Sequence, residues 1–321
     1  MVQEKDQRGL LIMRHNEKIT QEIRRRIAHN KFRDHLFWII GLLSTLIGFV
    51  VLFTLIIDLF ADGFPRLSWS FLTSYPSRFP EKAGILSAWV GTTLVMIVTA
   101  AAAVPLGIAT GVYLEEYSKK NWSTHIIEIN MNNLAGVPSI IYGLLALGLF
   151  VYFLKLGESI LTGGLTLGLL ILPMVVISTR ESIKAIPNSI REASYALGAT
   201  KWQTIKDHIL PYSIGGILTG MIIGLSRAIG ETAPIITVGA LTFIAFLPSS
   251  PVTSAFPFLT FKWLFDPFTV MPIQMFNWVS RPQKEFHLNA AAAGIILLLM
   301  TLVMNGFAVY LRYKFRKRIK W

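Results

Sequence analysis

Residues 191–231, REASYALGATKWQTIKDHILPYSIGGILTGMIIGLSRAIGE, decide how this chain is expected to fold. The first half is polar and carries residues that start and stop helices, whereas the second half is an apolar helix striped with glycine. Arg227 and Glu231 stand near the far end of that helix. This order predicts a segment that faces a soluble partner, followed by a membrane-crossing helix that presents charge to a solute.

The composition agrees with a membrane protein. Of the 321 residues, 53% are hydrophobic and 15% are charged, whereas soluble domains carry about 25% charged residues. The chain has no cysteine, which excludes disulfides and thiol-based metal or redox sites. No phosphate-binding G-x-x-x-x-G-K-[ST] loop, nucleophile motif or metal-ligand spacing of histidines is present. We therefore predict a chain that is not an enzyme, with no metal site and no cofactor of its own.

Six apolar runs are long enough to cross a bilayer, which takes about 20 residues. Together they predict an all-α integral membrane protein with six transmembrane helices. The runs cover approximately residues 36–59, 86–114, 134–154, 161–182, 212–240 and 288–311.

The distribution of Lys and Arg predicts the orientation of these spans. With the N-terminus inside, the inner segments hold 22 of these residues and the outer loops hold 7. Basic residues concentrate in cytoplasmic loops, so both termini are expected to be cytoplasmic. This bias also accounts for the net charge of +12 without a nucleic-acid partner.

The spans divide the chain into four parts. Ile19, Ile23 and Ile27 fall at helical spacing in the first part, which is either a surface amphipathic helix or a solvated tail that sets the topology. The parts are a basic cytoplasmic tail (1–34), the first span with an outer loop (35–85), a transmembrane core (86–311) that contains a cytoplasmic loop (187–211), and a second basic tail (312–321).

The third apolar run is interrupted near its start by Gly136 and Pro138. Such interruptions free backbone groups, and membranes tolerate them only where protein or water covers those groups. Two interpretations are open at this point: a wall of a solute pathway near Ser139 and Tyr142, or a kink that serves packing alone.

The polar segment carries two candidate capping boxes. In a capping box, the side chains of the first and fourth residues each accept a hydrogen bond from the other residue's backbone amide at the start of a helix. They are SIRE at 189–192 and TKWQ at 200–203. Between them, Gly198 is placed to end the first helix in a left-handed conformation. Pro211 is expected to break the second helix where the fifth span begins. The sequence thus predicts two short helices joined at an angle on the cytoplasmic side.

The fifth span combines a small-residue stripe with a charged pair. Small residues let membrane helices approach closely. Arg227 and Glu231 are four residues apart and so share a neighbouring helix face, where a partner offsets part of the roughly 2.5–3.5 kcal/mol cost of a mid-membrane Arg. They form either an anion site, because Arg presents a planar donor fork, or an internal pair for packing. The stripe is Gly216, Gly220, Gly224 and Ala228.

The polar segment resembles the EAA loop of ABC importer permeases. That pattern is Glu-Ala-Ala, three residues, Gly, nine residues, Ile, any residue, Leu and Pro. This chain departs from it at Ser194 and His208. The resemblance implies a coupling helix that docks in a separate ATPase subunit. The positions assigned to coupling are Glu192, Ala193, Ser194, Leu197, Gly198 and Ala199.

Four strings resemble a narrower family, the A-type membrane subunits of bacterial phosphate ABC importers. The likeness extends from about residue 86 to the C-terminus and implies a multi-pass protein of the bacterial inner membrane. It associates Arg227 with phosphate passage, and Arg180 either matches a second family arginine or is an anchor at a span end. The strings are ATGVYLEEYS (109–118), AGVPSIIYGL (135–144), SRAIGETAPIITVGA (226–240) and MPIQMFNWV (271–279).

The same resemblance implies the partners. A second, homologous permease subunit would complete the pathway as a heterodimer, and two copies of an ATPase subunit would sit below and use the ATP. A phosphate-binding protein would dock from outside, and membrane lipid would surround the assembly.

Three other interpretations were weighed against a phosphate permease. One is a permease for another oxyanion, and the second is a proton-coupled secondary anion transporter with Glu231 as relay. The third is a membrane scaffold in which Arg227 and Glu231 only pair. The EAA-like loop argues against the secondary transporter, and the scaffold stays open at this point.

Overall fold

The computed structural model describes residues 2–119, 121–252, 258 and 260–316, with side chains omitted at 2–25, 28, 123, 315 and 316. Helices are the only regular elements in the described residues. The chain divides into two compact units, Met1–Asp58 and Leu59–Trp321. Each unit is described separately below.

The first unit lies within one long helix, α1 (Val2–Gly63). Its stretch from His29 to Arg66, continued by a short 3-10 turn, is long and apolar enough to cross a membrane, and it contains the predicted first span. From residue 2 on, the basic tail predicted for 1–34 is therefore helical and continuous with that span. The candidate amphipathic pattern at Ile19 and Ile23 lies outside the side chains that are described.

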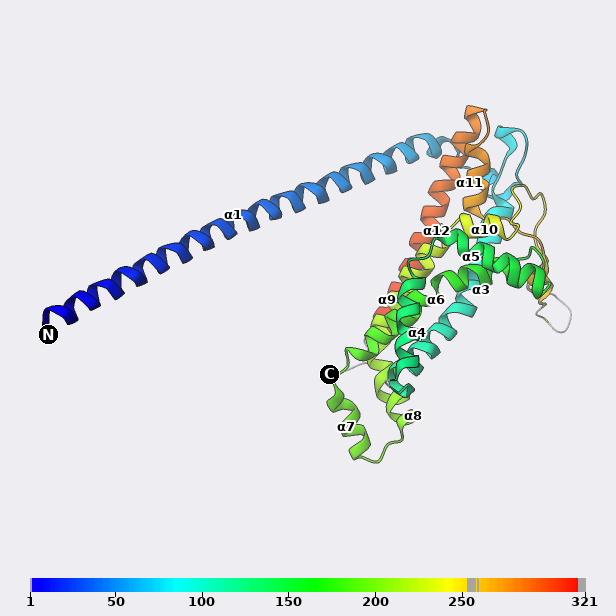
Figure 1. The fold of residues 1–321 in the computed structure, drawn as a ribbon. Helices are drawn as coiled ribbons and strands as arrows, with labels where there is room; N and C mark the ends of the chain where they lie inside the picture. The colour runs from blue at the N-terminus through cyan, green and yellow to red at the C-terminus, as the bar shows by residue number, and fades with distance from the viewer. Residues whose placement is uncertain (1, 120, 253–257, 259, 317–321) are drawn as a thin grey trace. The chain divides into compact units, whose positions relative to one another are not determined.

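The second unit is built around four long helices that run alongside one another (Figure 1). Helix α3 packs on α6, α6 on α9 and α9 on α12. Together with α1 they give five helices able to span a membrane by length and composition. The four are α3 (Leu86–Val112), α6 (Ile160–Lys184), α9 (Leu210–Ile229) and α12 (Lys284–Arg316).

The third predicted span is a bent pair of helices rather than one straight helix. Helix α4 (Trp122–Leu134) and helix α5 (Ser139–Ala146) meet at 110°, and the π-helical turn η4 (Leu147–Phe153) extends α5. The predicted interruption is confirmed, because Gly136 and Pro138 occupy the bend. Counted as one span, this pair raises the number of possible spans to six.

The fifth predicted span, 212–240, is too long at its outer end. Helix α9 stops at Ile229, and Gly230 caps it. After a turn, the short helix α10 (Ala233–Thr237) begins with a proline in its first turn. Pro234 has no amide to continue the α9 hydrogen-bond ladder, so the chain restarts as a new helix instead.

The expected break at Pro211 is also wrong. Helix α8 (Lys201–Thr204) continues through the π-helical turn η5 (Ile205–Ile209) directly into α9. Lys201–Ile229 is thus one continuous helical stretch. Pro211 lies just after this π-helical turn, whose wider i→i+5 pattern makes room for the proline ring inside the stretch.

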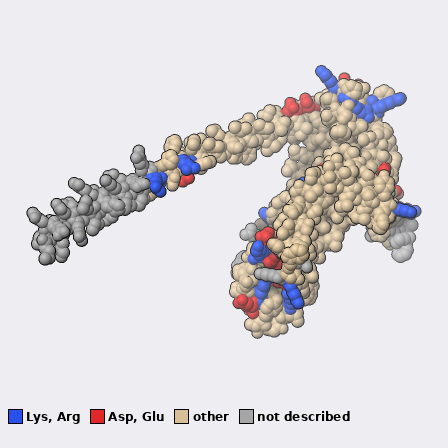
Figure 2. Space-filling view, viewed as in Figure 1, with Lys and Arg blue, Asp and Glu red and all other residues tan. Residues whose placement is uncertain are grey.

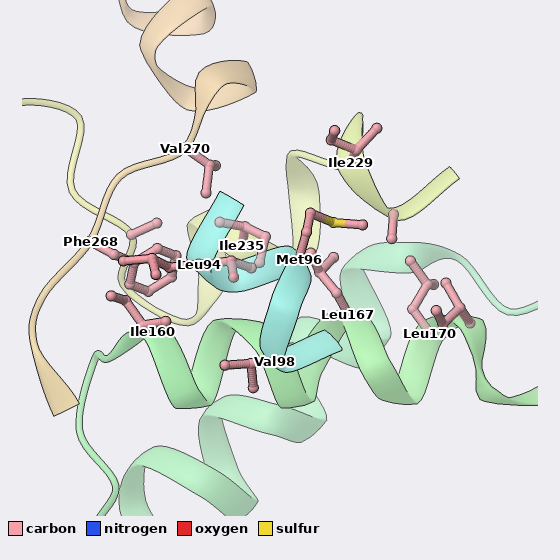
Figure 3. Close-up of a cluster of buried hydrophobic side chains, with 14 of the residues drawn as sticks. Leu94, Met96, Val98, Ile160, Leu167, Leu170, Ile229, Ile235, Phe268 and Val270 are labelled. Carbon is pink, nitrogen blue, oxygen red and sulfur yellow. The ribbon is translucent and has the colours of Figure 1, made fainter. Parts of the chain in front are cut away.

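The main core lies where α3, α6, α9 and α10 meet (Figure 3). Val98 of α3, Leu167 of α6 and Ile235 of α10 are buried there, together with Phe268 from the segment before α11. Figure 2 shows that the charged side chains of this unit gather at its two ends and leave an uncharged band between them.

Short elements cover the end of the bundle opposite α7 and α8. Arg66 fastens this cover, because its Nε donates to Asn289 Oδ1 (2.6 Å) and its Nη2 donates to the carbonyl oxygens of Pro80 and Glu81 (2.9 and 2.7 Å). The elements are η1 (Phe64–Arg66), α2 (Trp69–Thr73), η2 (Pro80–Lys82), η6 (Lys262–Phe265) and α11 (Met271–Val279).

The small-residue stripe of α9 faces α6. A Cβ added to Gly216 would lie 2.9 Å from Ser182 Cβ, and one added to Gly220 would collide with the side chain of Ser178. The Ser178 hydroxyl donates to the Gly216 carbonyl oxygen (3.1 Å), which joins the two helices directly. Gly224 and Ala228 continue the stripe as buried residues.

We expect Gly220→Val to destabilise the second unit by about 1–3 kcal/mol, because overpacking a close helix contact forces the backbones apart. Gly215→Val is the matched control, since a Cβ at that position meets nothing within 4 Å. Thermal unfolding in detergent measures both. Equal melting temperatures for the two variants would contradict the close packing of α6 and α9.

Candidate functional site

Arg227 and Glu231 lie where α9 ends. Arg227 Nε donates to Glu231 Oε1 at 3.2 Å. Arg227 belongs to the last turn of α9, where unpaired carbonyls and the helix dipole favour a cation. The side chain of Arg227 is 40% exposed and that of Glu231 is 17% exposed. The pair therefore leaves part of the guanidinium fork open to an incoming group.

The surroundings of this pair are mostly apolar. Arg227 Nη1 lies 4.0 Å from Met174 Sδ of α6. Glu231 borders a gap of about 10 Å³ that is otherwise lined mainly by apolar side chains, including Ile229 and Ile235. That gap holds at most one water molecule and is too small for an anion. The exposed side of Arg227 is open to an anion.

Helix α5 brings Ser139 and Tyr142 to the same region. The Tyr142 hydroxyl donates to the Leu134 carbonyl oxygen (2.7 Å), which ties α5 back to α4 across the bend. Gly143 packs so closely on α10 that an added Cβ would lie 2.7 Å from Pro234 Cα. Tyr142 is buried and Ser139 is half-buried. Helix α5 thus stands beside the turn that carries Glu231.

Arg180 lies further along α6. Six residues separate it from Met174, which corresponds to roughly 9 Å of helix rise. Its Nη2 contacts Glu128 Oε1 of α4 at 2.7 Å and Glu115 Oε2 at 3.5 Å. The structure therefore does not bring Arg180 into the Arg227 cluster, and it gives Arg180 two carboxylate partners of its own.

A second ion pair that the sequence analysis missed lies next to the first. Glu116 follows Glu115 in the π-helical turn η3 (Tyr113–Tyr117) at the end of α3. Arg191 Nη2 and Nε donate to Glu116 Oε1 at 2.7 and 3.0 Å. The adjacent Glu-Glu dipeptide was the only signal in the sequence, because the arginine partners are 65 and 75 residues away.

The polar segment forms two short helices, α7 (Asn188–Ala196) and α8. The capping box predicted at 189–192 is wrong, because the N-cap of α7 is Pro187, two residues before Ser189, and no side chain caps the helix. The fixed φ of proline already suits a helix start. Ser189 therefore lies inside the first turn and is not placed to cap it.

The junction between the helices follows the prediction. Gly198 has φ +82°, its amide donates to the Tyr195 carbonyl (2.9 Å), and the Ala199 amide donates to the Ser194 carbonyl (3.2 Å). This is a Schellman ending, which favours glycine at the left-handed position. The capping box of Thr200 and Gln203 is confirmed, with both of its hydrogen bonds formed.

The two helices place their predicted coupling residues on two sides. Ser194 is buried, and its hydroxyl lies 2.9 Å from that of Thr204 on α8. Leu197 is 89% exposed, which is unusual for a large apolar side chain with no neighbour to cover it. Glu192, Ala193 and Gly198 are exposed, and Ala199 is half-buried. The segment presents a small, partly apolar tip at the end of the bundle (Figure 1).

Comparison with known protein families identifies one match. The family described as "Binding-protein-dependent transport system inner membrane component" matches residues 103–317. This range covers helices α4 to α12 and the C-terminal part of α3 from residue 103 on, and therefore includes the charged pair and the polar segment.

Individual proteins similar to this chain are also transporter subunits. The chain is 28% identical to the phosphate transport system permease protein PstA of Yersinia pestis, covering 92% of this chain and 95% of that one. It is 30% identical to PstA of Mycobacterium leprae, covering 92% of each. A solved bacterial alginate ABC transporter has a similar fold, with a TM-score of 0.61, 17% identity, and coverage of 86% of this chain and 93% of that one.

We expect Gly198→Ala to loosen the junction of α7 and α8, because a left-handed conformation costs other residues roughly 1–2 kcal/mol. Gly198→Asn is the matched control, since asparagine adopts this conformation more readily. Hydrogen exchange of the amides in 188–204 should rank the variants as glycine, asparagine and alanine in falling protection. Equal protection in all three would contradict a role for the left-handed residue.

Proposed function

This chain belongs to the family of binding-protein-dependent transport system inner membrane components, and from that premise we propose that it imports phosphate as one of two permease subunits. It is a multi-pass membrane protein and a permease subunit of an ABC importer. We further propose its solute, its partner subunits and the residues that contact each of them. The naming of similar proteins as phosphate permeases supports the choice of solute.

The observation that carries the proposal is the half-open guanidinium of Arg227. An arginine exposed to hydrocarbon is costly, whereas a planar fork with free donors suits the oxygens of a tetrahedral oxyanion. Glu231 holds Arg227 from one side and leaves the other side free. Arg227 would thus contact phosphate transiently as it passes, with Ser139 and Tyr142 on the neighbouring helix as candidate walls.

A second, homologous permease subunit would supply the other half of the pathway. The gap beside Glu231 has a volume of about 10 Å³, while the Arg227 side chain is 40% exposed. A pathway between two such subunits removes that exposure from lipid and gives the anion a polar route. Arg180, roughly 9 Å further along α6, would be the next positive charge on that route.

ATP would be consumed by partner subunits that dock on the tip of α7 and α8. The exposed Leu197 provides an apolar anchor, and Glu192 and Ala193 lie exposed on the helix that precedes it. Two ATPase copies would serve the two permease subunits, and a phosphate-binding protein would deliver the anion to the opposite end. With both termini cytoplasmic, the tip faces the compartment that holds ATP.

We expect Arg227→Ala to lower the uptake of labelled phosphate by roughly tenfold to a hundredfold, the range that losing a charged hydrogen bond produces. Arg227→Lys should recover part of the uptake, because lysine keeps the charge but not the fork. Uptake is measured in proteoliposomes that contain the chain with its partner subunits, at matched protein levels.

Arg78→Ala serves as the control, because Arg78 lies in the segment between α2 and η2, away from α9. Glu231→Gln tests selectivity in the same assay. A carboxylate accepts a hydrogen bond from a protonated phosphate oxygen and repels sulfate, so sulfate should compete better in this variant. Normal uptake in Arg227→Ala would remove the pathway role, and uptake that follows a proton gradient without ATP would favour a secondary transporter.

We expect Leu197→Asp to weaken binding of the ATPase subunits by about tenfold or more, because it replaces a central apolar anchor with a charge. Leu247→Asp is the control, an exposed leucine in the loop between α10 and η6. Co-purification of the ATPase with the tagged permease measures the effect. Undiminished co-purification would place the docking surface elsewhere.

A further inference from the structure

Two adjacent glutamates at the end of α3 point to arginines on different helices. Glu116 pairs with Arg191 of α7, and Glu115 lies 3.5 Å from Arg180 of α6, which in turn contacts Glu128 of α4. One π-helical turn therefore connects the polar segment, the bundle and the bent third span. The two connections differ in burial and in the number of hydrogen bonds.

The connection through Arg191 is enclosed. The Glu116 side chain is 6% exposed and accepts two hydrogen bonds from Arg191. Arg191 also donates to the carbonyl oxygens of Ile186 (2.9 Å) and Ile183 (3.2 Å) and to Asn188 Oδ1 (3.3 Å). Breaking a buried, multiply bonded pair leaves an uncompensated charge and is strongly unfavourable. This joint holds α7 to the ends of α3 and α6.

The connection through Glu128 is open. The Glu128 side chain is 32% exposed and makes one close contact with Arg180, whose Nε has no hydrogen-bond partner among the described residues. The pair borders a polar hollow of about 420 Å³, also lined by His125 and Lys184. Ion pairs in contact with water contribute little and exchange easily with solvent. Helix α4 itself is largely exposed along its length.

We propose that the two connections have opposite roles in transport. The Glu116–Arg191 joint stays closed, so that α7 moves as one body with α3 and α6. The Arg180–Glu128 contact opens in each cycle and lets α4 separate from α6. This inference rests on the proposed function, since it assumes that the segment of α7 and α8 is moved by an ATPase. Glu116 is a positioning residue, because it touches Arg191 and not the solute.

Two charge-removing variants separate the roles in the complete, reconstituted complex. Glu116→Gln should raise the ATP hydrolysed per phosphate imported by about tenfold or more, because movement of α7 no longer reaches the ends of α3 and α6. Glu128→Gln should retain uptake within about twofold and raise ATP hydrolysis in the absence of the binding protein, because an exposed pair is easily replaced. Glu285→Gln, at the start of α12, controls for loss of one carboxylate.

The ratio of ATP to phosphate for Glu116→Gln is compared only when the amount of variant protein in the membrane matches that of the unchanged chain. Arg191→Lys provides the second variant if those levels fall, because it keeps the charge but loses the fork, and it should uncouple in the same direction. If the ATP hydrolysed per phosphate imported is unchanged in both variants, the proposed role of the Glu116–Arg191 joint is wrong. If Glu128→Gln loses as much phosphate uptake as Glu116→Gln, the proposal that the two connections have opposite roles is wrong.

Distances between spin labels test the movement without reference to the solute. The chain has no cysteine of its own, so labels attach only to introduced ones. The pair Ile127→Cys with Lys184→Cys should move apart when the ATPase is trapped in its ATP-bound state. The pair Tyr117→Cys with Ser189→Cys should keep its distance. If the complex does not import phosphate but the first distance grows and the second stays constant, the proposed solute is wrong and the inference stands. If both distances change alike, the inference is wrong.

Discussion

The contact of α9 with α6 determines where everything else in the second unit lies. Because Gly216 and Gly220 carry no side chain, the helices approach until Ser178 donates to the α9 backbone. A single added Cβ would collide with α6 at either glycine. That approach brings Arg227 to within 4.0 Å of Met174 on α6. The position of the candidate anion contact therefore follows from the absence of side chains several turns away.

The cost of charge at membrane depth explains how the arginines are held. Arg227 and Arg180 each have a carboxylate partner, and Arg227 keeps a free side. An arginine that was fully paired and enclosed could not receive an anion, and one without any partner would be expensive to insert. The observed arrangement lies between these limits. It is the arrangement expected of a residue that exchanges one partner for a passing anion.

Local features could be predicted from the sequence and long-range ones could not. The left-handed Gly198 and the Thr200–Gln203 capping box depend on neighbouring residues, and both were found as expected. The start of α7 was misplaced by two residues because Pro187 competes with Ser189 for the N-cap position. The Arg180–Glu128 pair joins residues 52 apart, and no local pattern marks such a contact. Spacing alone left Arg227 between two interpretations; resemblance to a family favours the anion contact, and that role stays a prediction.

The missing break at Pro211 has a consequence for coupling. Since α8 continues through η5 into α9, the polar tip and Arg227 belong to one helical stretch from Lys201 to Ile229, which is roughly 43 Å long. A separate coupling helix would pass a push to the bundle through side-chain contacts, which can slip. A continuous helix passes an axial displacement through its own backbone hydrogen bonds. A movement of α8 at the docking surface would therefore arrive at the guanidinium of Arg227 with little loss.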